Sequence, residues 1–126
     1  MKDISGSPQS ETLKTHRVRF SVEADNRLRM LKGRTGITPN LLCRLAFCLS
    51  VSESGDPVSD DSELSNREIN RYTLLGEYDR LFVSLLKIRH ADAAHDVLAL
   101  TSLLSQHMHR GIALLANRVK SPAAVL

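Results

Sequence analysis

Residues 33–39 constrain the fold of this chain more than any other stretch, because they predict a short turn between two amphipathic helices. Gly33 can adopt the left-handed backbone conformation that ends a helix, and Gly36 gives the turn a second flexible point. Thr38 suits the N-cap position, and Pro39 suits the first position of the next helix, where its missing N–H costs nothing. The sequence therefore predicts helix, turn and helix in close succession.

The same turn has the features of an anion-binding site. The helix that begins after Thr38 presents free amides and the positive end of its dipole, and Lys32 and Arg34 lie beside it in the sequence. We expect these residues, together with Thr35, to bind a phosphate group. An exposed connecting turn whose basic residues only favour solubility is the alternative, and the turn alone does not decide between them.

The composition favours a single domain of packed helices. Aromatic residues make up only 4 % of the 126 residues, Trp is absent, and the apolar side chains are mostly Leu, Ala and Val. Such a composition is typical of helical packing rather than of a sandwich or barrel. No apolar run approaches the roughly 20 residues of a membrane span, and the N-terminus lacks the apolar core of a signal peptide. We therefore expect a cytoplasmic protein that does not enter a membrane.

Charge is distributed unevenly along the chain. The formal net charge is +3, but residues 16–50 hold seven basic and two acidic residues, which gives 7 − 2 = +5. Residues 51–68 hold one basic and six acidic residues, which gives 1 − 6 = −5. A positive field over the first half is what nucleic-acid binding requires. Intramolecular pairing of the basic face with the acidic stretch is the alternative explanation.

The N-terminal part predicts a tail followed by a strand. Residues 1–15 are polar and show no periodicity, so we expect a disordered tail before a single helical domain over residues 16–121. Residues 16–22 alternate between polar and apolar types, which predicts a half-buried strand. Its predicted inner face is Val18, Phe20 and Val22, and its predicted outer face is Arg17, Arg19 and Ser21.

Four helices follow from the spacing of apolar residues. We expect them over about 24–32, 39–49, 76–90 and 97–120, with an acidic loop at about 50–65. Their predicted buried residues are, in order, Leu28 and Leu31; Leu41, Leu42, Leu45, Ala46 and Leu49; Tyr78, Leu81, Phe82, Leu85 and Leu86; and Leu100, Leu104, Met108, Gly111 and Leu115.

A short internal echo predicts a second strand. Residues 71–74 repeat the order of residues 19–22: basic, aromatic, hydroxyl and aliphatic. If the echo is more than chance, the strand-helix-helix unit is present twice and its two strands pair as an antiparallel ribbon. Arg71 and Thr73 then lie opposite Arg17, Arg19 and Ser21 on the outer face. This is the ribbon-helix-helix plan, in which a two-stranded ribbon can enter the DNA major groove.

Several blocks of residues resemble the DndE family of bacterial DNA sulfur-modification (phosphorothioation) proteins. The blocks are Asp25–Leu28, Leu31–Asn40, Asn70–Asp79 and Leu114–Lys120, and the resemblance spans about residues 16–121. It implies a non-catalytic DNA-binding subunit that prefers nicked duplex DNA, forms a homo-oligomer (a tetramer being favoured) and works beside sulfur-transfer and ATPase subunits. The acidic loop and residues 90–105 have no close counterpart in this resemblance.

No catalytic or metal site is expected from the residues. Cys43 and Cys48 are five apart on one helix, which suits reduced core residues better than a shared metal. His107 and His109 point to different sides of their helix, so a metal site with His90 and His95 is disfavoured. Nothing places Ser, His and Asp as a triad, and no carboxylate pair on the basic face would hold magnesium. No cofactor is implied.

Three functional hypotheses remain. The first is a duplex DNA-binding subunit that uses a basic face, with candidate contacts Arg17, Arg19, Arg27, Lys32, Arg34, Thr35, Thr38 and Arg71. The second is an interaction or scaffold subunit of the modification complex without direct DNA affinity. The third, which we disfavour, is an enzyme acting on sulfur or on the DNA backbone. We also expect the apolar surface of the last helix to exceed one core-facing stripe and to form a subunit interface.

Overall fold

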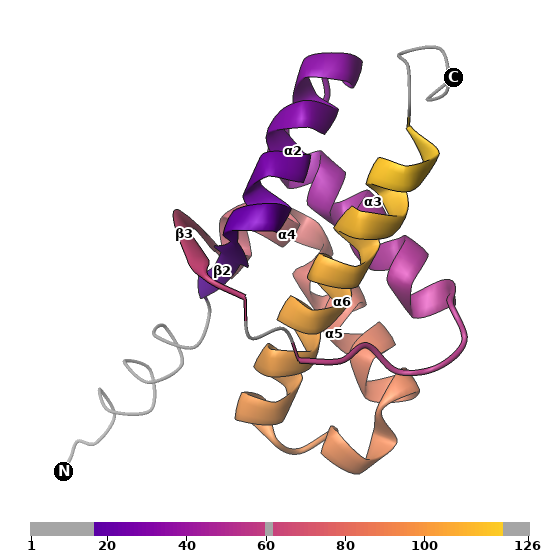
Figure 1. Cartoon of the computed structure of the whole chain (residues 1–126). Coiled ribbons are helices and arrows are strands. Elements are labelled where there is room, and N and C mark those ends of the chain that lie inside the picture. Colours follow the sequence, from indigo (N-terminus) through magenta and orange to yellow (C-terminus); the bar gives the residue numbers. More distant parts are fainter. Residues whose placement is uncertain (1–16, 60–61, 120–126) are drawn as a thin grey trace, which may run out of the picture.

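Over its described residues the fold is mainly helical with a two-stranded antiparallel ribbon, as the sequence predicts (Figure 1). The computed structural model describes residues 17–59 and 62–119, so the predicted tail over 1–15 lies outside the described residues. No described helix is both long enough and apolar enough to cross a membrane. The elements are β2 (Arg17–Ser21), α2 (Val22–Thr35), α3 (Pro39–Ser52), β3 (Leu64–Asn70), α4 (Arg71–Leu75), the 3-10 turn η1 (Gly76–Tyr78), α5 (Asp79–Arg89), the 3-10 turn η2 (Ala91–Ala93) and α6 (Val97–Arg118).

The first strand is where the alternation predicts it, but it ends earlier. Val18 and Phe20 are 2 % and 0 % exposed, which confirms the inner face. Ser21 is not an outer-face residue: it is buried and caps α2, with its Oγ accepting a 3.0 Å hydrogen bond from the Ala24 amide. Val22 is already the first residue of the helix and is 38 % exposed, so its predicted burial was wrong.

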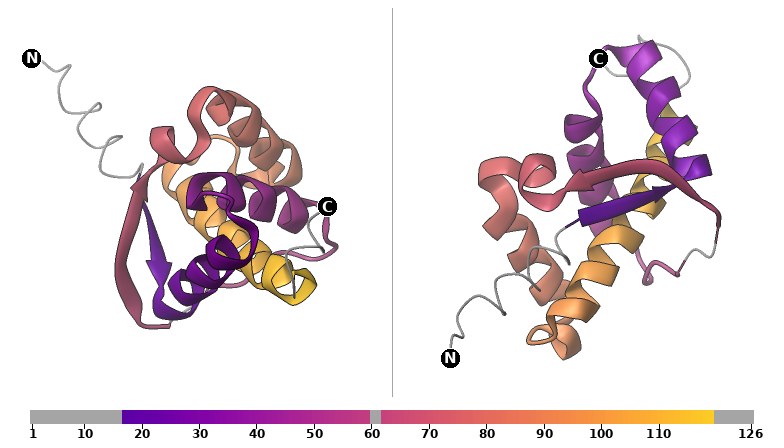
Figure 2. Two further views of the ribbon diagram at one scale, coloured as in Figure 1. Left: turned by 90° about the horizontal axis from the view of Figure 1, so that it is seen from above. Right: turned by 90° about the vertical axis from the view of Figure 1, so that its left-hand side faces the viewer.

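The second strand is β3 and not residues 71–74. β3 pairs antiparallel with β2, with Val18 opposite Ile69 and Arg19 opposite Glu68, and the ribbon lies along one side of the helices (Figure 2). Residues 71–75 form α4, which Asn70 caps by accepting a 2.8 Å hydrogen bond from the Tyr72 amide. The echo between residues 19–22 and 71–74 is therefore not a structural repeat.

An ion pair explains why β3 escapes a search for alternating apolar residues. The inner face of β3 holds Arg67, whose Nε donates a 2.5 Å hydrogen bond to Oδ1 of Asp25 on α2. Asp25 is only 5 % exposed, and its Oδ2 also lies 3.2 Å from Nη2 of Arg29. A charged pair therefore holds β3 against α2 where an apolar side chain would have given the period-two pattern.

The core lies mainly between α3 and α6. The buried side of α3 is Leu42, Cys43, Ala46, Phe47 and Ser50, whereas the predicted Leu41 and Leu45 are each 47 % exposed. Because α3 is apolar on most sides, the period of its apolar residues does not define which side is buried. On α5, Phe82 and Leu86 are buried as predicted. Leu81 on α5 and Tyr78 in η1, which were also predicted to be buried, are 53 % and 46 % exposed.

Helix α6 runs through the centre of the monomer. The predicted Leu100, Leu104, Met108 and Gly111 are buried, and so is Ile112. Leu103 and Leu115 are partly buried and pack against the same core. The apolar surface of α6 that the sequence predicts to be surplus is thus largely covered within one chain. Helix α3 packs against α6 on one side. Helix α5 and strand β2 of the ribbon contact α6 elsewhere.

The approach of α6 to α3 depends on Gly111. A Cβ atom added at Gly111 would lie 1.8 Å from the carbonyl oxygen of Ala46, far inside van der Waals contact. We predict that Gly111→Ala destabilises the fold by about 3 kcal/mol or more, because the two backbones must move apart. Urea denaturation monitored by circular dichroism measures this change.

Gly33 provides the matched control. It lies within α2, and a Cβ added there would meet no atom within 4 Å. Gly33→Ala should therefore stabilise the protein by up to about 0.5–1 kcal/mol through the helix propensity of alanine. Equal effects of the two substitutions would contradict the close packing of α3 on α6.

Candidate nucleic-acid interface

The outer face of the ribbon carries two exposed arginines around one glutamate. The side chains of Arg17 and Arg19 are 62 % and 60 % exposed. Glu68 on β3 accepts a 2.6 Å hydrogen bond from Arg17 Nη1, and its other oxygen lies 3.8 Å from Arg19 Nε. Arg17 and Arg19 therefore point outward together, as predicted, and both guanidinium groups remain accessible to solvent.

Helix α2, which follows β2 directly, adds further basic side chains. Arg27 forms a 2.5 Å ion pair with Glu23. The side chain of Arg29 contacts Asp25 but is still 69 % exposed. Lys32 is exposed near the end of the helix. Residues 17–36 hold six basic and two acidic residues, which gives 6 − 2 = +4, and β3 adds Arg67 and Glu68, which cancel. The surface formed by β2, β3 and α2 (below, the basic face) thus carries a formal charge of +4.

The turn after α2 is built differently from the prediction in one respect. Gly33 is helical, and Gly36 is the left-handed residue that ends α2, with φ at 73° and its amide donating to Lys32 O at 2.8 Å. Thr35 Oγ1 donates to Leu31 O at 2.8 Å and accepts from the Ile37 amide at 3.0 Å, so its single O–H donor already serves the turn. Phosphate contact by Thr35 would compete with these bonds.

Thr38 and Pro39 start α3 as predicted. Thr38 has the extended backbone of an N-cap residue, and Pro39 is the first helical residue. The Thr38 side chain makes no capping hydrogen bond, and the first turn of α3 holds no acidic residue. Arg34 is exposed, but its Nη1 donates a 3.1 Å hydrogen bond to Val119 O at the end of α6. Lys32 is therefore the more available of the two cations at this turn.

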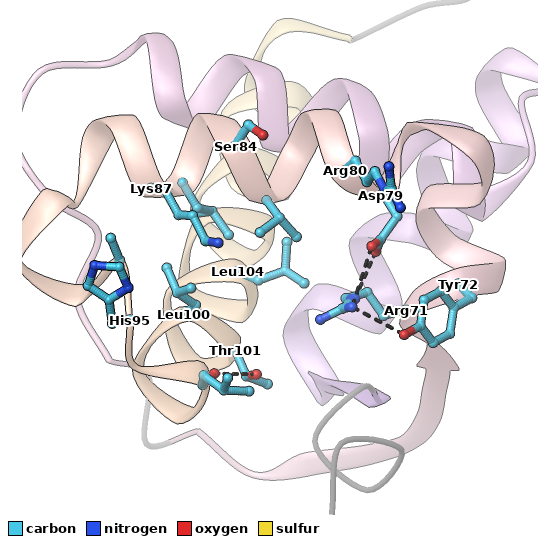
Figure 3. A pocket seen from close by; sticks show the side chains of 14 residues that line it. Arg71, Tyr72, Asp79, Arg80, Ser84, Lys87, His95, Leu100, Thr101 and Leu104 are labelled. Atoms are coloured by element: carbon cyan, nitrogen blue, oxygen red, sulfur yellow. Dashed lines mark hydrogen bonds and ion pairs between the residues drawn. The ribbon is translucent and has the colours of Figure 1, made fainter. Parts of the chain in front are cut away.

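Arg71 lies just beyond the end of the ribbon and not on its outer face. It belongs to α4, its side chain is only 15 % exposed, and its Nε lies 2.8 Å from Asp79 Oδ1. Its guanidinium also packs over the Tyr72 ring at 5.1 Å and lines a pocket between α5 and α6 (Figure 3). Its predicted place on the outer face of the ribbon was wrong, because that prediction depended on a strand at residues 71–74.

Arg29 and Arg67 are additions to the predicted set. The side chain of Arg29 is more exposed than those of Arg17, Arg19, Arg27 and Arg67. Its position on α2, between Arg27 and Lys32, was visible in the sequence. Arg67 was not recognisable, since its partner Asp25 is 42 residues away in the chain. Its placement depends on strand pairing, which local spacing does not reveal.

The acidic stretch contacts a different part of the molecule. Arg89 donates to the carbonyls of Val51 and Glu53 at 2.7 and 2.9 Å and lies 3.8 Å from the Asp56 carboxylate. Arg110 donates to Gly55 O at 3.1 Å. Residues 51–56 are thus held by Arg89 of α5 and Arg110 of α6. Among the described residues of the acidic stretch 51–68, Glu68 is the one whose carboxylate pairs with Arg17 and Arg19. The described contacts of residues 51–56 are therefore with α5 and α6 and not with the basic face.

Ser50 of α3 and two histidines form a polar chain that is buried at His107 and half-buried at His90. Ser50 Oγ accepts a 2.8 Å hydrogen bond from Arg110 Nε and lies 2.7 Å from His107 Nδ1. His107 Nε2 lies 2.9 Å from Nε2 of His90. The spacing of Ser50 and His107 is that of a nucleophile and its base, but both residues are 0 % exposed. A substrate therefore cannot reach this hydroxyl.

The remaining histidine and cysteine candidates have structural surroundings. His109 lies between the Ser21 amide, which donates to its Nε2 at 3.1 Å, and Ser105 O, 2.8 Å from its Nδ1. Cys43 is buried as predicted, and burial raises the pKa of its thiol to about 12. Cys48 is exposed, so its predicted place in the core was wrong. Within the described ranges no three His, Cys, Asp or Glu side chains gather as metal ligands.

Comparison with protein families identifies the chain. Residues 17–123 match the family model of the DNA sulphur modification protein DndE. The chain belongs to the DndE family.

Solved structures agree with this assignment. DndE from Escherichia coli B7A, described as involved in DNA phosphorothioation modification, is 33 % identical and superposes with a TM-score of 0.67 over 79 % of this chain and 95 % of that one. A DndE variant with two glycines replaced by lysine, involved in DNA phosphorothioation, is 28 % identical with a TM-score of 0.64 over 81 % and 97 %. No curated protein sequence matches the chain.

The buried histidine chain predicts a pH-dependent stability. Burial first, and then the neighbouring His90, Arg110 and Arg89, lower the pKa of His107 to about 4 from its usual 6.5, with Asp56 opposing them. The unfolded chain therefore binds a proton at this residue as the pH falls below 6.5, whereas the folded chain does not. The free energy of unfolding should fall by up to about 1.4 kcal/mol per pH unit between 6.5 and 4 from this group.

Denaturant midpoints measured across this pH range test the prediction. His107→Gln should be less stable than the parent at neutral pH but should show a shallower decline on acidification. His95→Gln, at an exposed position, is the matched control and should keep the parental profile. An unchanged profile in the His107 variant would show that another group titrates.

Proposed function

We propose that this DndE-family chain is a non-catalytic, DNA-binding subunit of a DNA phosphorothioation system and that it works in the cytoplasm. The observation that carries the proposal is the basic face, whose elements β2, β3 and α2 together carry a formal charge of +4 and expose several arginine and lysine side chains. The relative from Escherichia coli is involved in DNA phosphorothioation, which makes DNA the natural anionic partner. The inaccessible Ser50 and His107 pair supports a non-catalytic role.

Backbone contact is the mode of binding that the basic face favours. Its cations are exposed arginine and lysine side chains, which suit phosphate oxygens without reading a base sequence. Arg17, Arg19, Arg27, Lys32 and Arg34 keep the role proposed from the sequence, and Arg29 joins them. Thr35 and Thr38 remain proposed contacts through the backbone of the turn. Arg71 is less suited, because Asp79 already neutralises it.

Glu68 gives the ribbon an internal competitor for DNA. Its carboxylate occupies the position between Arg17 and Arg19 that a phosphate would take. DNA binding must therefore either displace these contacts or use the arginines' remaining donors. Removing the charge of Glu68 should free both guanidinium groups without altering the fold, because the residue lies on the exposed outer face.

These contacts predict opposite effects for two ribbon variants. Replacing Arg17 and Arg19 by Ala should weaken duplex binding and make the salt dependence of affinity shallower by about one to two units, since fewer counterions are released. Glu68→Gln should strengthen binding. Lys32→Glu should weaken it, which tests the turn separately.

Fluorescence anisotropy with nicked and intact duplexes at two salt concentrations measures all three variants. Parental affinity in the arginine and Lys32 variants would exclude the basic face as the binding surface. Absence of DNA affinity in the parent even at low salt would leave the scaffold alternative, a subunit that joins other proteins of the system.

We further propose a homo-oligomer, with a tetramer favoured, whose subunits contact each other through α3 and the end of α6. The exposed Leu41 and Leu45 continue into a groove lined by Leu45, Cys48, Leu49, Leu115 and Val119. This apolar surface replaces the one expected on α6 alone. Several basic faces around one duplex would select a nick, because a nick bends more freely than intact DNA.

Leu45→Glu tests the assembly. It should shift the protein toward a 14.0 kDa monomer in sedimentation velocity and lower its preference for nicked DNA, while its helical content stays. Val58→Glu adds the same charge at an 81 % exposed apolar position and is the matched control. A parent that sediments as a monomer yet binds nicked DNA strongly would exclude the oligomer.

A further inference from the structure

A second surface of the molecule combines apolar and basic side chains. It is a groove of about 560 Å³ between α5 and the first half of α6, closed at one end by α4 (Figure 3). Its floor consists of Leu86, Leu100 and Leu104, which belong to the core and are at most 9 % exposed. Val97, at the start of α6, is 54 % exposed and extends this floor toward solvent.

The rim of the groove is basic. Arg80 and Lys87 on α5 and His95 before α6 all line it and are exposed. Asp79 is the acidic side chain among the lining residues, and its carboxylate is paired with Arg71 at 2.8 Å. The pair cancels, so Arg80 and Lys87 leave the rim with a formal charge of +2 even with His95 neutral. An occupant should therefore carry acidic groups beside its apolar ones.

The dimensions of the groove fit a helical segment. Arg80 and Lys87 are seven residues apart on one side of α5, which places them about 10 Å apart along the axis, or two helical turns. The opposite wall of the groove is one face of α6, formed by residues at helical spacing: Val97, Leu100, Thr101 and Leu104. Apolar anchors at positions i, i+3 or i+4 and i+7 of a docked helix suit such a groove.

The groove lies apart from the turn that starts α3. Figure 1 shows α5 and the start of α6 at the lower end of the molecule, with the α2–α3 turn and the end of α6 at the upper end. DNA phosphates need cations but gain nothing from an apolar floor, whereas an amphipathic helix uses both. The chemistry of the groove therefore favours a protein partner over DNA.

We propose that this groove binds an acidic amphipathic helix belonging to another protein of the modification system. The inference rests on the proposed place of this chain in that system and does not rest on its DNA binding. The apolar side of the helix would cover Val97 and the accessible edge of Leu100, and its flanking carboxylates would pair with Arg80 and Lys87. One subunit could then hold DNA at one surface and a partner at another.

The experiment separates the two surfaces by charge reversal. The full chain is co-expressed with the other proteins of the modification system, and complex formation is followed by size-exclusion chromatography. Arg80→Glu with Lys87→Glu should weaken complex formation at least about tenfold while leaving nicked-duplex affinity at the parental value. Arg17→Glu with Arg19→Glu makes the same change of charge on the basic face. This variant should lose nicked-duplex affinity and keep parental complex formation.

Two further measurements keep the outcome independent of misfolding. Circular dichroism and denaturation establish that each variant folds, and hydrogen exchange on the parental complex should show protection of α5 and the first half of α6. Loss of both activities in the Arg80 and Lys87 variant would assign the groove to DNA. Retention of the complex, or protection confined to other elements, would show that the groove is not the docking site.

Discussion

The close contact of α3 with α6 is the interaction on which the rest of the structure depends. It exists because residue 111 has no side chain: the Ala46 carbonyl occupies the space that a Cβ would fill. With the two backbones this close, Leu42, Phe47 and Met108 become fully buried, and Ser50 meets His107 at 2.7 Å. The apolar residues of α6 are consequently used within the monomer, and the outer side of α3 is left exposed.

Polar and charged contacts then position the elements that the core does not hold. The Asp25–Arg67 pair fastens β3 to α2, and His109 joins α6 to the start of α2 through the Ser21 amide. Breaking such a buried pair by removing one partner is costly, because the other charge stays buried. The orientation of the basic face is thus set by a few specific contacts as well as by apolar packing.

The fold also divides the positive charge of the molecule into separate uses. Arg44, Arg89 and Arg110 donate to backbone carbonyls and tie α3, α4 and residues 51–56 together. Arg17, Arg19, Arg29 and Lys32 remain exposed and are available to an anionic partner. Arg80 and Lys87 border an apolar groove instead. Net charge alone does not distinguish these three uses, since each arginine contributes equally to a sum over the sequence.

By itself the sequence determined the elements whose signals are local. Period-two alternation located β2, Thr38 and Pro39 located the start of α3, and four-residue spacing identified the buried side of α6. The exposed arginines at positions 17 and 19 followed from the same alternation. These features depend on neighbours within about one helical turn, where backbone geometry relates spacing directly to direction.

Only the tertiary structure decided the features that depend on distant partners. β3 is a strand because it pairs with β2 and because Arg67 meets Asp25, 42 residues away, and neither fact leaves a periodic trace in residues 64–70. The same holds for the buried side of α3, which is set by the approach of Gly111 because apolar residues lie on most sides of that helix. Arg71 lies at the groove and not on the basic face because Asn70 starts a helix at that point.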